Sequence, residues 1–356
     1  MKKIGIMTMQ RIRNYGSFLQ AYALKKTIES LGYNVDFVDY KFEKSLINDN
    51  RKIIKLLNKV KKHINIYQLI KRKKFTKKFN NTYDNDFLPM LNISKLNYNP
   101  NIDTLVIGSD EVFNCLQSFP VGYSRNLFGY EYEKNKLISY AASFGFTNIK
   151  DLKKYNVEKE ISNMLKNFSS ISVRDNNSFN IVKELTNIDS TINVDPVLIY
   201  DFPANLREID IKNYIIVYAY TERLSREEEK YIKNFAKKYN KKILSLGSYQ
   251  RIADYMKIVN PLDILSYFKN ADFVITDTFH GSVFSMKTNT KFCTIIRNSN
   301  HNKLSDLLNR LDKSSQIVNN IEEIEMKYKE KIDFKNTNRI IEKERKKAIE
   351  FLKNNL

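Results

Sequence analysis

The sequence predicts an α/β fold in which two doubly wound domains face each other across a cleft. Near its start, strand Lys3–Thr8, helix Ser17–Leu31 and strand Val35–Tyr40 form one βαβ unit, and the crossover of such a unit makes the sheet parallel. A second run of alternating strands and helices begins at Tyr214. The length of 356 residues suits two domains, because one domain usually takes about 100–200 residues.

The boundary between the domains is expected in the segment 201–213. We therefore place an N-terminal domain at 1–205, a C-terminal domain at 206–335 and a charged terminal helix at 336–356. The second half alternates between strand and helix patterns. Its expected strands are Tyr214–Tyr220, Lys242–Leu246, Asp272–Thr276 and Lys291–Ile296, and its expected helices are Ser225–Tyr239, Leu262–Phe268, one from Phe279, Lys303–Leu311, Ile321–Lys329 and Thr337–Leu352.

The composition indicates a chain with a large core. Hydrophobic residues make up 42%, and 9 Gly and 6 Pro are too few for a loop-rich or disordered protein. Cys115 and Cys293 show no metal-ligand spacing, so neither a zinc site nor a disulfide framework is expected. The first apolar run is short and interrupted by Arg, and no stretch reaches the ~18 apolar residues of a membrane span. We expect a cytoplasmic protein.

The net charge of +20 raises the question of an anionic partner. Lys, Asn and Ile are abundant along the whole chain, and no zinc-finger spacing or RNA-binding aromatic motif occurs. We therefore expect no nucleic-acid partner. The segment Arg51–Phe79 carries twelve Lys or Arg, no acid, and apolar residues near helical spacing. It is either a peripheral contact with the inner face of the membrane or a helix that packs its apolar face on the core.

The stretch Ala271–Ser285, ADFVITDTFHGSVFS, contains one of only three histidines. Its first half is a buried-type strand, Thr278 is placed to cap a helix, and Gly281 and Ser282 lie in the first turn of that helix. A helix N-terminus attracts anions, and His280 can titrate near neutral pH. The stretch therefore predicts an anion site with a proton donor beside it, and the alternative is a histidine packed as structure.

Polar residues also follow other predicted strands, at the edge where open α/β sheets bind ligands. The loop after the first strand offers Asn14, Tyr15 and Gly16, although an ordinary turn before an N-cap at Ser17 would use the same residues. The remaining candidates are Ser109, Asp110 and Glu111 after strand Thr104–Ile107, and Arg174, Asp175 and Ser178 after strand Ser170–Val173. Arg174 is suited to hold a carboxylate or phosphate, or else forms a surface ion pair. The segment Val194–Val197 is interpreted as a turn.

Taken in order, several segments resemble the polysaccharide pyruvyl transferase family. They are NYGSFLQAYAL within Ile4–Leu24, IGSDEVFN at 107–114, SYAASFG at 139–145, SVRDNNS at 172–178, VDPVLI at 194–199 and TDTFHGSVFS at 276–285. The hallmarks of a serine hydrolase, a zinc protease and a P-loop enzyme do not occur.

The resemblance implies two Rossmann-like domains similar to those of GT-B glycosyltransferases. It also implies transfer of pyruvyl to a sugar, forming a ketal, with phosphoenolpyruvate as donor substrate and without a cofactor or metal. The sugar would belong to a capsule, an exopolysaccharide or another cell-surface polysaccharide, or to its lipid-linked precursor. The acceptor would bind on the N-terminal side and the donor on the C-terminal side. By the same resemblance, His280 is the general acid, and Arg174 with Asp175 and Ser178 forms the donor motif.

One departure concerns the two residues before the histidine. Some established members of the family carry an Arg-Leu pair there, whereas this sequence has Thr278 and Phe279. Arg297, Lys291 and Lys287 are candidates to replace the missing cation. The departure keeps two alternatives open, a GT-B-type glycosyltransferase that uses a nucleotide sugar and a catalytically decayed glycan-binding protein.

Overall fold

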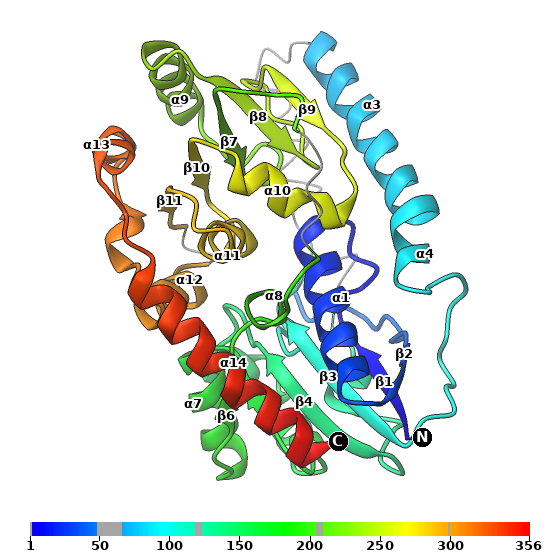
Figure 1. Cartoon of the computed structure of the whole chain (residues 1–356). Helices are drawn as coiled ribbons and strands as arrows, with labels where there is room; N and C mark the ends of the chain where they lie inside the picture. Colours follow the sequence, from blue (N-terminus) through cyan, green and yellow to red (C-terminus); the bar gives the residue numbers. More distant parts are fainter. Residues whose placement is uncertain (1, 48–65, 118–122, 204–208, 298–299) are drawn as a thin grey trace.

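Two six-stranded parallel sheets form the framework of the chain in the part that the structure describes (Figure 1). This computed structural model describes residues 2–47, 66–117, 123–203, 209–297 and 300–356. The strand order is β2-β1-β3-β4-β5-β6 in the first sheet and β12-β11-β10-β7-β8-β9 in the second. All neighbouring strands in these sheets run parallel, as expected where helices connect successive strands.

The first sheet is built from β1 (Lys3–Met7), β2 (Asn34–Phe37), β3 (Thr104–Asp110), β4 (Lys136–Ala142), β5 (Ser172–Val173) and β6 (Thr191–Ile192). Its central strands β3 and β4 are buried along almost their whole length, which is typical of parallel strands covered on both faces. The associated helices are α1 (Tyr15–Ser30), α3 (Ile66–Thr82), α4 (Leu88–Met90), α5 (Ile149–Lys154), α6 (Glu158–Leu165), α7 (Asn176–Thr186) and α8 (Pro196–Ile199), with a π-helical turn η1 (Tyr83–Phe87) and a 3₁₀ turn η2 (Arg125–Phe128).

The second sheet is built from β7 (Tyr214–Tyr218), β8 (Lys242–Leu246), β9 (Tyr255–Lys257), β10 (Phe273–Thr276), β11 (Phe292–Ile295) and β12 (Ile317–Val318). Its helices are α9 (Arg226–Lys238), α10 (Ile264–Lys269), α11 (Phe279–Lys287), α12 (His301–Arg310) and α13 (Glu323–Lys329), with 3₁₀ turns η3 (Pro261–Asp263) and η4 (Ser314–Gln316). The strands of the first sheet precede residue 205 and those of the second follow residue 206. The predicted domain boundaries themselves stay predictions.

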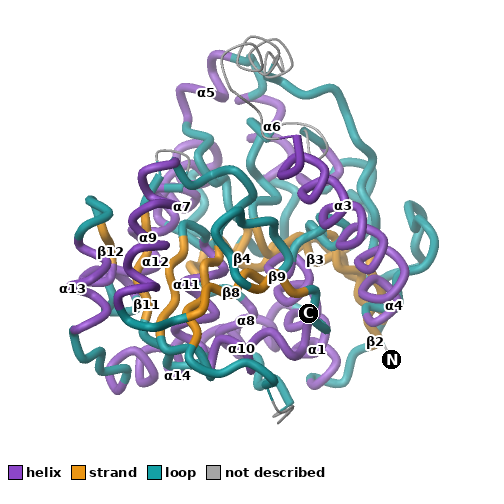
Figure 2. The backbone as a smooth tube through the Cα atoms, turned by 90° about the horizontal axis from the view of Figure 1, so that it is seen from above, coloured by secondary structure: helices purple, strands orange, loops and turns teal. Residues whose placement is uncertain are grey.

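The helices surround the strands, which lie inside the molecule (Figure 2). The last helix, α14 (Lys335–Asn355), returns from the second sheet to the first. Its Phe351 ring lies 6.4 Å from the ring of Tyr140 on β4, and the Leu356 carbonyl accepts a hydrogen bond of 3.0 Å from Lys2 Nζ. The terminal helix is therefore part of the packing of the first sheet.

Two local predictions are corrected by the structure. The segment interpreted as a turn at Val194–Val197 contains the start of α8, where the Asp195 side chain accepts a hydrogen bond from the Val197 N–H and Pro196 opens the helix. Pro suits this first helical position because its missing N–H has no partner there in any case. Helix α1 is capped by Asn14, whose side chain accepts from the Ser17 N–H, so Ser17 is not the cap.

The basic segment predicted at Arg51–Phe79 is described only from residue 66 onward, and its earlier residues lie outside the described part. Within α3, Phe79 is buried, whereas Ile66, Tyr67 and Ile70 are exposed. The interpretation that this helix packs its whole apolar face on the core is therefore wrong for the first turns of α3. No helix in the described ranges combines the length and hydropathy that a bilayer crossing requires.

Candidate active site

A cavity of about 230 Å³ lies between the two sheets, at the carboxyl ends of their strands. Parallel α/β folds bind ligands at this edge because the loops and helix N-termini gather there. The first half of the chain contributes Met9, Ile12, Asn14, Ser17, Asp110, Glu111, Gln117 and Phe146, and the second half contributes Tyr220, Arg223, Thr278, Phe279, Asn300 and Lys303.

Three helices begin at this cavity. Asn14, Thr278 and Asn300 are the N-caps of α1, α11 and α12, and all three line the cavity. The cap side chains of Asn14 and Thr278 accept from backbone N–H groups of their own helices, whereas Asn300 makes no such bond. The positive ends of three helix dipoles therefore favour an anion in this space.

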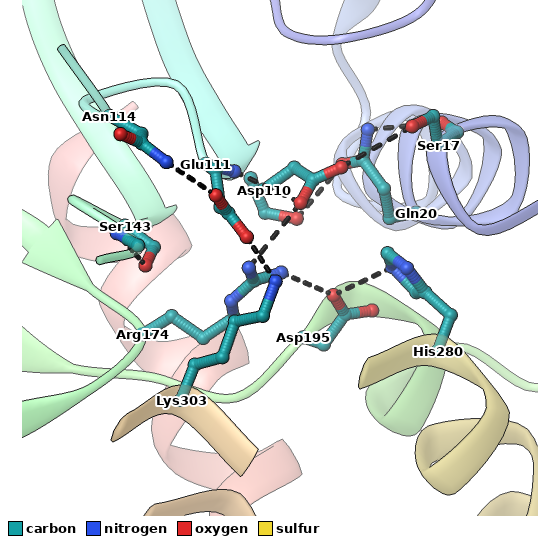
Figure 3. Close-up of polar contacts among 12 residues, drawn as sticks. Ser17, Gln20, Asp110, Glu111, Asn114, Ser143, Arg174, Asp195, His280 and Lys303 are labelled. Atoms are coloured by element: carbon teal, nitrogen blue, oxygen red, sulfur yellow. Dashed lines mark hydrogen bonds and ion pairs between the residues drawn. The ribbon is translucent and has the colours of Figure 1, made fainter. Parts of the chain in front are cut away.

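His280 lies beside the cavity in the first turn of α11. Its Nε2 is buried and stands 3.5 Å from Oδ2 of the fully buried Asp195. On its other side the ring lies against Gly16, where an added Cβ would come within 2.9 Å of the His280 Cβ and closer still to the ring. Helix α1 and Asp195 thus hold the imidazole from two sides (Figure 3).

Arg174 lies behind the cavity wall. Its guanidinium is 3.1 Å from Asp195 and 3.3 Å from Asp110, and it stacks over the Phe279 ring at 4.1 Å. Burial opposes ionisation of Asp195, but its contacts with His280 and Arg174 outweigh burial and hold its pKa below the ordinary value. Likewise, Arg174, His280 and Lys303 outweigh burial at Asp110 and lower its pKa. Arg174 therefore keeps two buried carboxylates charged.

Two carboxylates reach the cavity wall from the end of β3. Asp110 accepts a long hydrogen bond of 3.4 Å from Ser17, and Glu111 accepts one of 2.6 Å from Asn114. Glu111 also pairs with Lys303 of α12, which bridges the two halves of the chain across the cavity. Burial raises the pKa of Glu111, but Lys303 outweighs it and the pKa is lowered overall.

Arg223 supplies a second cation to the cavity wall. Its guanidinium is 3.3 Å from Oδ2 of Asp277, which is fully buried after β10. Arg297 lies 3.4 Å from the same oxygen and forms a two-pronged ion pair with Glu228. Burial raises the pKa of Asp277 despite both guanidinium groups.

The family model of polysaccharide pyruvyl transferases matches residues 14–300. The chain belongs to the polysaccharide pyruvyl transferase family. A comparison with curated proteins gives no significant match.

Solved structures share the fold of this pyruvyl transferase family member. S. aureus MnaA with UDP matches at a TM-score of 0.51 and 11% identity, over 96% of this chain and 91% of that one. The Methanocaldococcus jannaschii UDP-GlcNAc 2-epimerase with UDP-GlcNAc and UDP matches at 0.52 and 12%, over 96% and 99%. The glycotransferase of kitacinnamycin matches at 0.50 and 8%, over 100% and 99%. These similarities confirm the predicted fold class, two Rossmann-like domains facing across a cleft as in GT-B glycosyltransferases.

The structure places several predicted site residues on or beside the cavity. Asn14, Asp110, Glu111 and Thr278 line it, Gly16 supports His280, and the small size of Gly281 lets α11 approach Thr276, with which an added Cβ would collide. These residues come from both halves of the chain, as expected for a site between two domains.

Other predicted site residues serve the packing around the site. Tyr15 is buried, and its hydroxyl donates to the Val259 carbonyl at 2.9 Å. Ser109 donates to Gln20 beneath α1. Asp175 caps α7 by accepting from Ser178, and Ser282 exchanges a hydrogen bond with Thr294 in the interior. None of these five predicted site residues, Ser178 included, lines the described cavity.

The candidates for the missing cation lie elsewhere. Arg297 is occupied by Glu228 and Asp277, Lys287 donates to the Leu198 carbonyl, and Lys291 donates to the Tyr328 carbonyl. The cations that do line the cavity are Arg223 and Lys303, which the sequence motifs do not single out. Arg223 follows the end of β7 by five residues, so the general rule about strand ends indicates it. Lys303 lies eight residues after β11, within the next helix α12, where that rule does not single it out.

Among the described residues, no group of three or more His, Cys, Asp or Glu is arranged to hold a metal ion. The cavity acids Asp110 and Glu111 are paired with Arg174 and Lys303. The chemistry that this arrangement offers is proton transfer next to a bound anion.

Proposed function

We propose that this protein transfers pyruvyl from phosphoenolpyruvate to a hydroxyl pair on a sugar of a cell-surface polysaccharide or its lipid-linked precursor, forming a cyclic ketal. The observation that carries the proposal is the pairing of His280 with the buried Asp195 beside a cavity that is lined by cations and helix N-termini. A histidine with a carboxylate behind it is suited to give and regain a proton near neutral pH.

The donor is a small trianion, and the cavity is suited to it. Lys303 and Arg223 face the space from the second half of the chain, beside the N-terminus of α12. A volume of about 230 Å³ is room for about eight water molecules at ~30 Å³ each. This size is sufficient for a three-carbon phosphate ester. In this proposal Arg223 and Lys303 take the part of the Arg that is absent before His280.

The reaction needs one acid and one base. In this proposal His280 gives its proton to the methylene carbon of phosphoenolpyruvate, which becomes a methyl group and leaves an electron-poor central carbon. One sugar hydroxyl adds to that carbon and loses its proton to a wall carboxylate. The second hydroxyl displaces phosphate, closes the ring and returns its proton to His280, and the departing phosphate takes up the proton held by the wall carboxylate. One phosphoenolpyruvate and one diol thus give one ketal and one phosphate.

Asp110 and Glu111 are the wall carboxylates available as base. Their lowered pKa values keep both ionised, and either can take the proton once attack on the electron-poor carbon has made the hydroxyl strongly acidic. Asp195 stabilises the charged imidazole and keeps the ring in place. The proposed chemistry needs no cofactor, and because phosphoenolpyruvate is made inside cells, it places the protein in the cytoplasm.

The test is phosphate release from phosphoenolpyruvate in the presence of free or lipid-linked sugars. We expect His280→Gln to lower kcat by about 10²–10⁴-fold, the range that general acid catalysis contributes, with a much smaller change in donor Kd. His301→Gln is the matched control, because that histidine is exposed at the start of α12. A folded His280→Gln protein with normal kcat would remove His280 from the mechanism. Thermal stabilisation by a nucleotide sugar, but not by phosphoenolpyruvate, would favour the glycosyltransferase alternative.

A further inference from the structure

Helix α3 exposes three large apolar side chains within five consecutive residues. Ile66, Tyr67 and Ile70 are 71%, 63% and 59% exposed. They account for three of the ten exposed large hydrophobic side chains in the described part of the chain. Removing such side chains from water is favourable, so a cluster of this kind indicates a surface that is covered in use.

The same face continues as a basic surface. Residues three or four positions apart lie on the same side of a helix. Lys73 and Lys77 therefore lie in line with Ile66 and Ile70, and the lysines at positions 71, 74 and 78 lie in a neighbouring line with Tyr67. All five of these lysines are exposed, and Ile66–Thr82 contains no acid. Apolar and basic groups therefore share one exposed face, which we call the α3 face.

The opposite side of α3 is fixed to the body of the protein. The Phe79 ring packs at 5.6 Å from the ring of Tyr15, and Arg72 forms an ion pair with Glu222 before α9. Figure 1 shows α3 running along the outside of the molecule, with one flank against it. The α3 face is thus held rigidly and presented outward.

A groove of about 530 Å³ lies along α3 and includes two lysines of the α3 face. It is lined by Arg13, Arg72, Lys73 and Lys77, together with Asp84, Thr76, Asn80 and Asn81. Arg13 is the residue directly before Asn14, which lines the cavity and caps α1. The groove and the cavity are therefore lined by neighbouring residues of the chain at this point.

We propose that the α3 face docks on an anionic membrane surface. Its charge complements acidic phospholipid headgroups, while Ile66 and Ile70 enter the boundary of the acyl chains, as the apolar side of an interfacial helix does. A polyanion such as nucleic acid would use the lysines but gives no role to the exposed apolar residues. The docking does not rest on the proposed function. If both hold, the surface brings a lipid-linked acceptor to the cavity.

Vesicle co-sedimentation of the full chain tests the proposal. The probes are vesicles of equal parts phosphatidylglycerol and phosphatidylcholine, compared with phosphatidylcholine alone and with duplex DNA. A lysine near an anionic leaflet strengthens binding by up to about fivefold, so neutralising Lys73, Lys74 and Lys77 to Gln should weaken binding to the anionic vesicles by up to about a hundredfold. The matched control neutralises three exposed lysines of α9, at positions 230, 233 and 237, which removes the same charge from a helix remote from α3 (Figure 1).

The apolar half of the surface is tested by Ile66→Ser together with Ile70→Ser. These side chains are exposed, so the melting temperature should be unchanged, and binding to anionic vesicles should weaken while binding to DNA does not. Absence of anionic vesicle binding at low salt would overturn the proposal. An equal loss of vesicle binding in the α9 control would also overturn it. Unchanged vesicle binding in the variant of Ile66 and Ile70 would do the same, because the α3 face would then be only a general binding surface for polyanions. Because phosphate release from phosphoenolpyruvate is measured separately, failure of docking and failure of the proposed function are distinguishable.

Discussion

The ring of His280 fills the space that a side chain at Gly16 would need, so the first turn of α1 and the first turn of α11 meet without a gap. These two helices belong to different sheets. The position of the histidine is therefore set jointly by both halves of the chain.

We expect Gly16→Ala to lower kcat by about a hundredfold, because displacing a catalytic group by ~1 Å has an effect of this size. Overpacking should also lower the free energy of unfolding by about 1–3 kcal/mol. The matched control is Gly32→Ala at the other end of α1, where φ is +91° and no atom lies within 4 Å of the added Cβ. This control should lose stability through backbone strain and keep its kcat. A Gly16→Ala enzyme that loses stability alone would contradict the catalytic placement of His280.

Arg174→Ala should act mainly on stability. It leaves Asp110 and Asp195 without their shared partner, and an unpaired buried charge typically costs about 3–5 kcal/mol. Thermal and urea unfolding measure this loss. The triple variant Arg174→Met, Asp110→Asn, Asp195→Asn removes all three charges and should recover most of the stability without recovering activity. Arg174→Ala with normal stability and a raised donor KM would instead restore Arg174 as the donor clamp that the family motif implies.

Lys303→Met should raise the donor KM by about ten- to a hundredfold, since a hydrogen bond to a charged group is worth about 1.5–3 kcal/mol. Lys291→Met is the control, because its amine binds the Tyr328 carbonyl away from the cavity. Steady-state kinetics with phosphoenolpyruvate as varied substrate measure both. Equal donor KM values for the two variants would place the donor anion elsewhere.

Acid should unfold this protein through its buried carboxylates. The pKa values of Asp195, Asp110 and Glu111 are lowered in the folded state. Their stabilisation is therefore complete above the unfolded pKa values of about 4 and is lost as the pH falls through the folded values. We expect the melting temperature to fall steeply below about pH 4, and Asp195→Asn to make that decline shallower. The exposed Asp86→Asn serves as control, and an identical slope in Asp195→Asn would refute the assignment.

Local pattern predicted much of the fold. Strand β8 has the bounds that the sequence indicates, Lys242–Leu246. Charged residues mark the start of this β-rich run and a Gly follows its end, so both bounds are recognisable. The start of α11 was likewise predictable, since Thr278 and Gly281 form a recognisable cap. Short strands such as β12 (Ile317–Val318) were not predictable, because two residues carry no period.

The site was predictable only in part. Asp195 follows β6 and precedes a Pro, a pattern that fits a turn as well as the helix start it proves to be. Its role depends on the approach of His280, 85 positions along the chain from it. Lys303 and Glu111 meet in the same way across the two sheets. Contacts of this kind depend on how the sheets are placed, and no local spacing encodes that placement.

The return of α14 to the first sheet has a mechanical consequence. The chain leaves the first sheet after α8 and comes back along α14, and these two helices pack on each other, with Arg345 of α14 pairing with Asp201. Because the two crossings lie side by side, we expect any rotation of the second sheet relative to the first to occur about this line and to separate Lys303 from Glu111. A donor-bound crystal structure should show that rotation with α8 and α14 keeping their mutual contact. Such a rotation would open the cavity on the side away from α8 and α14, and it would require the ion pair between Lys303 and Glu111 to break.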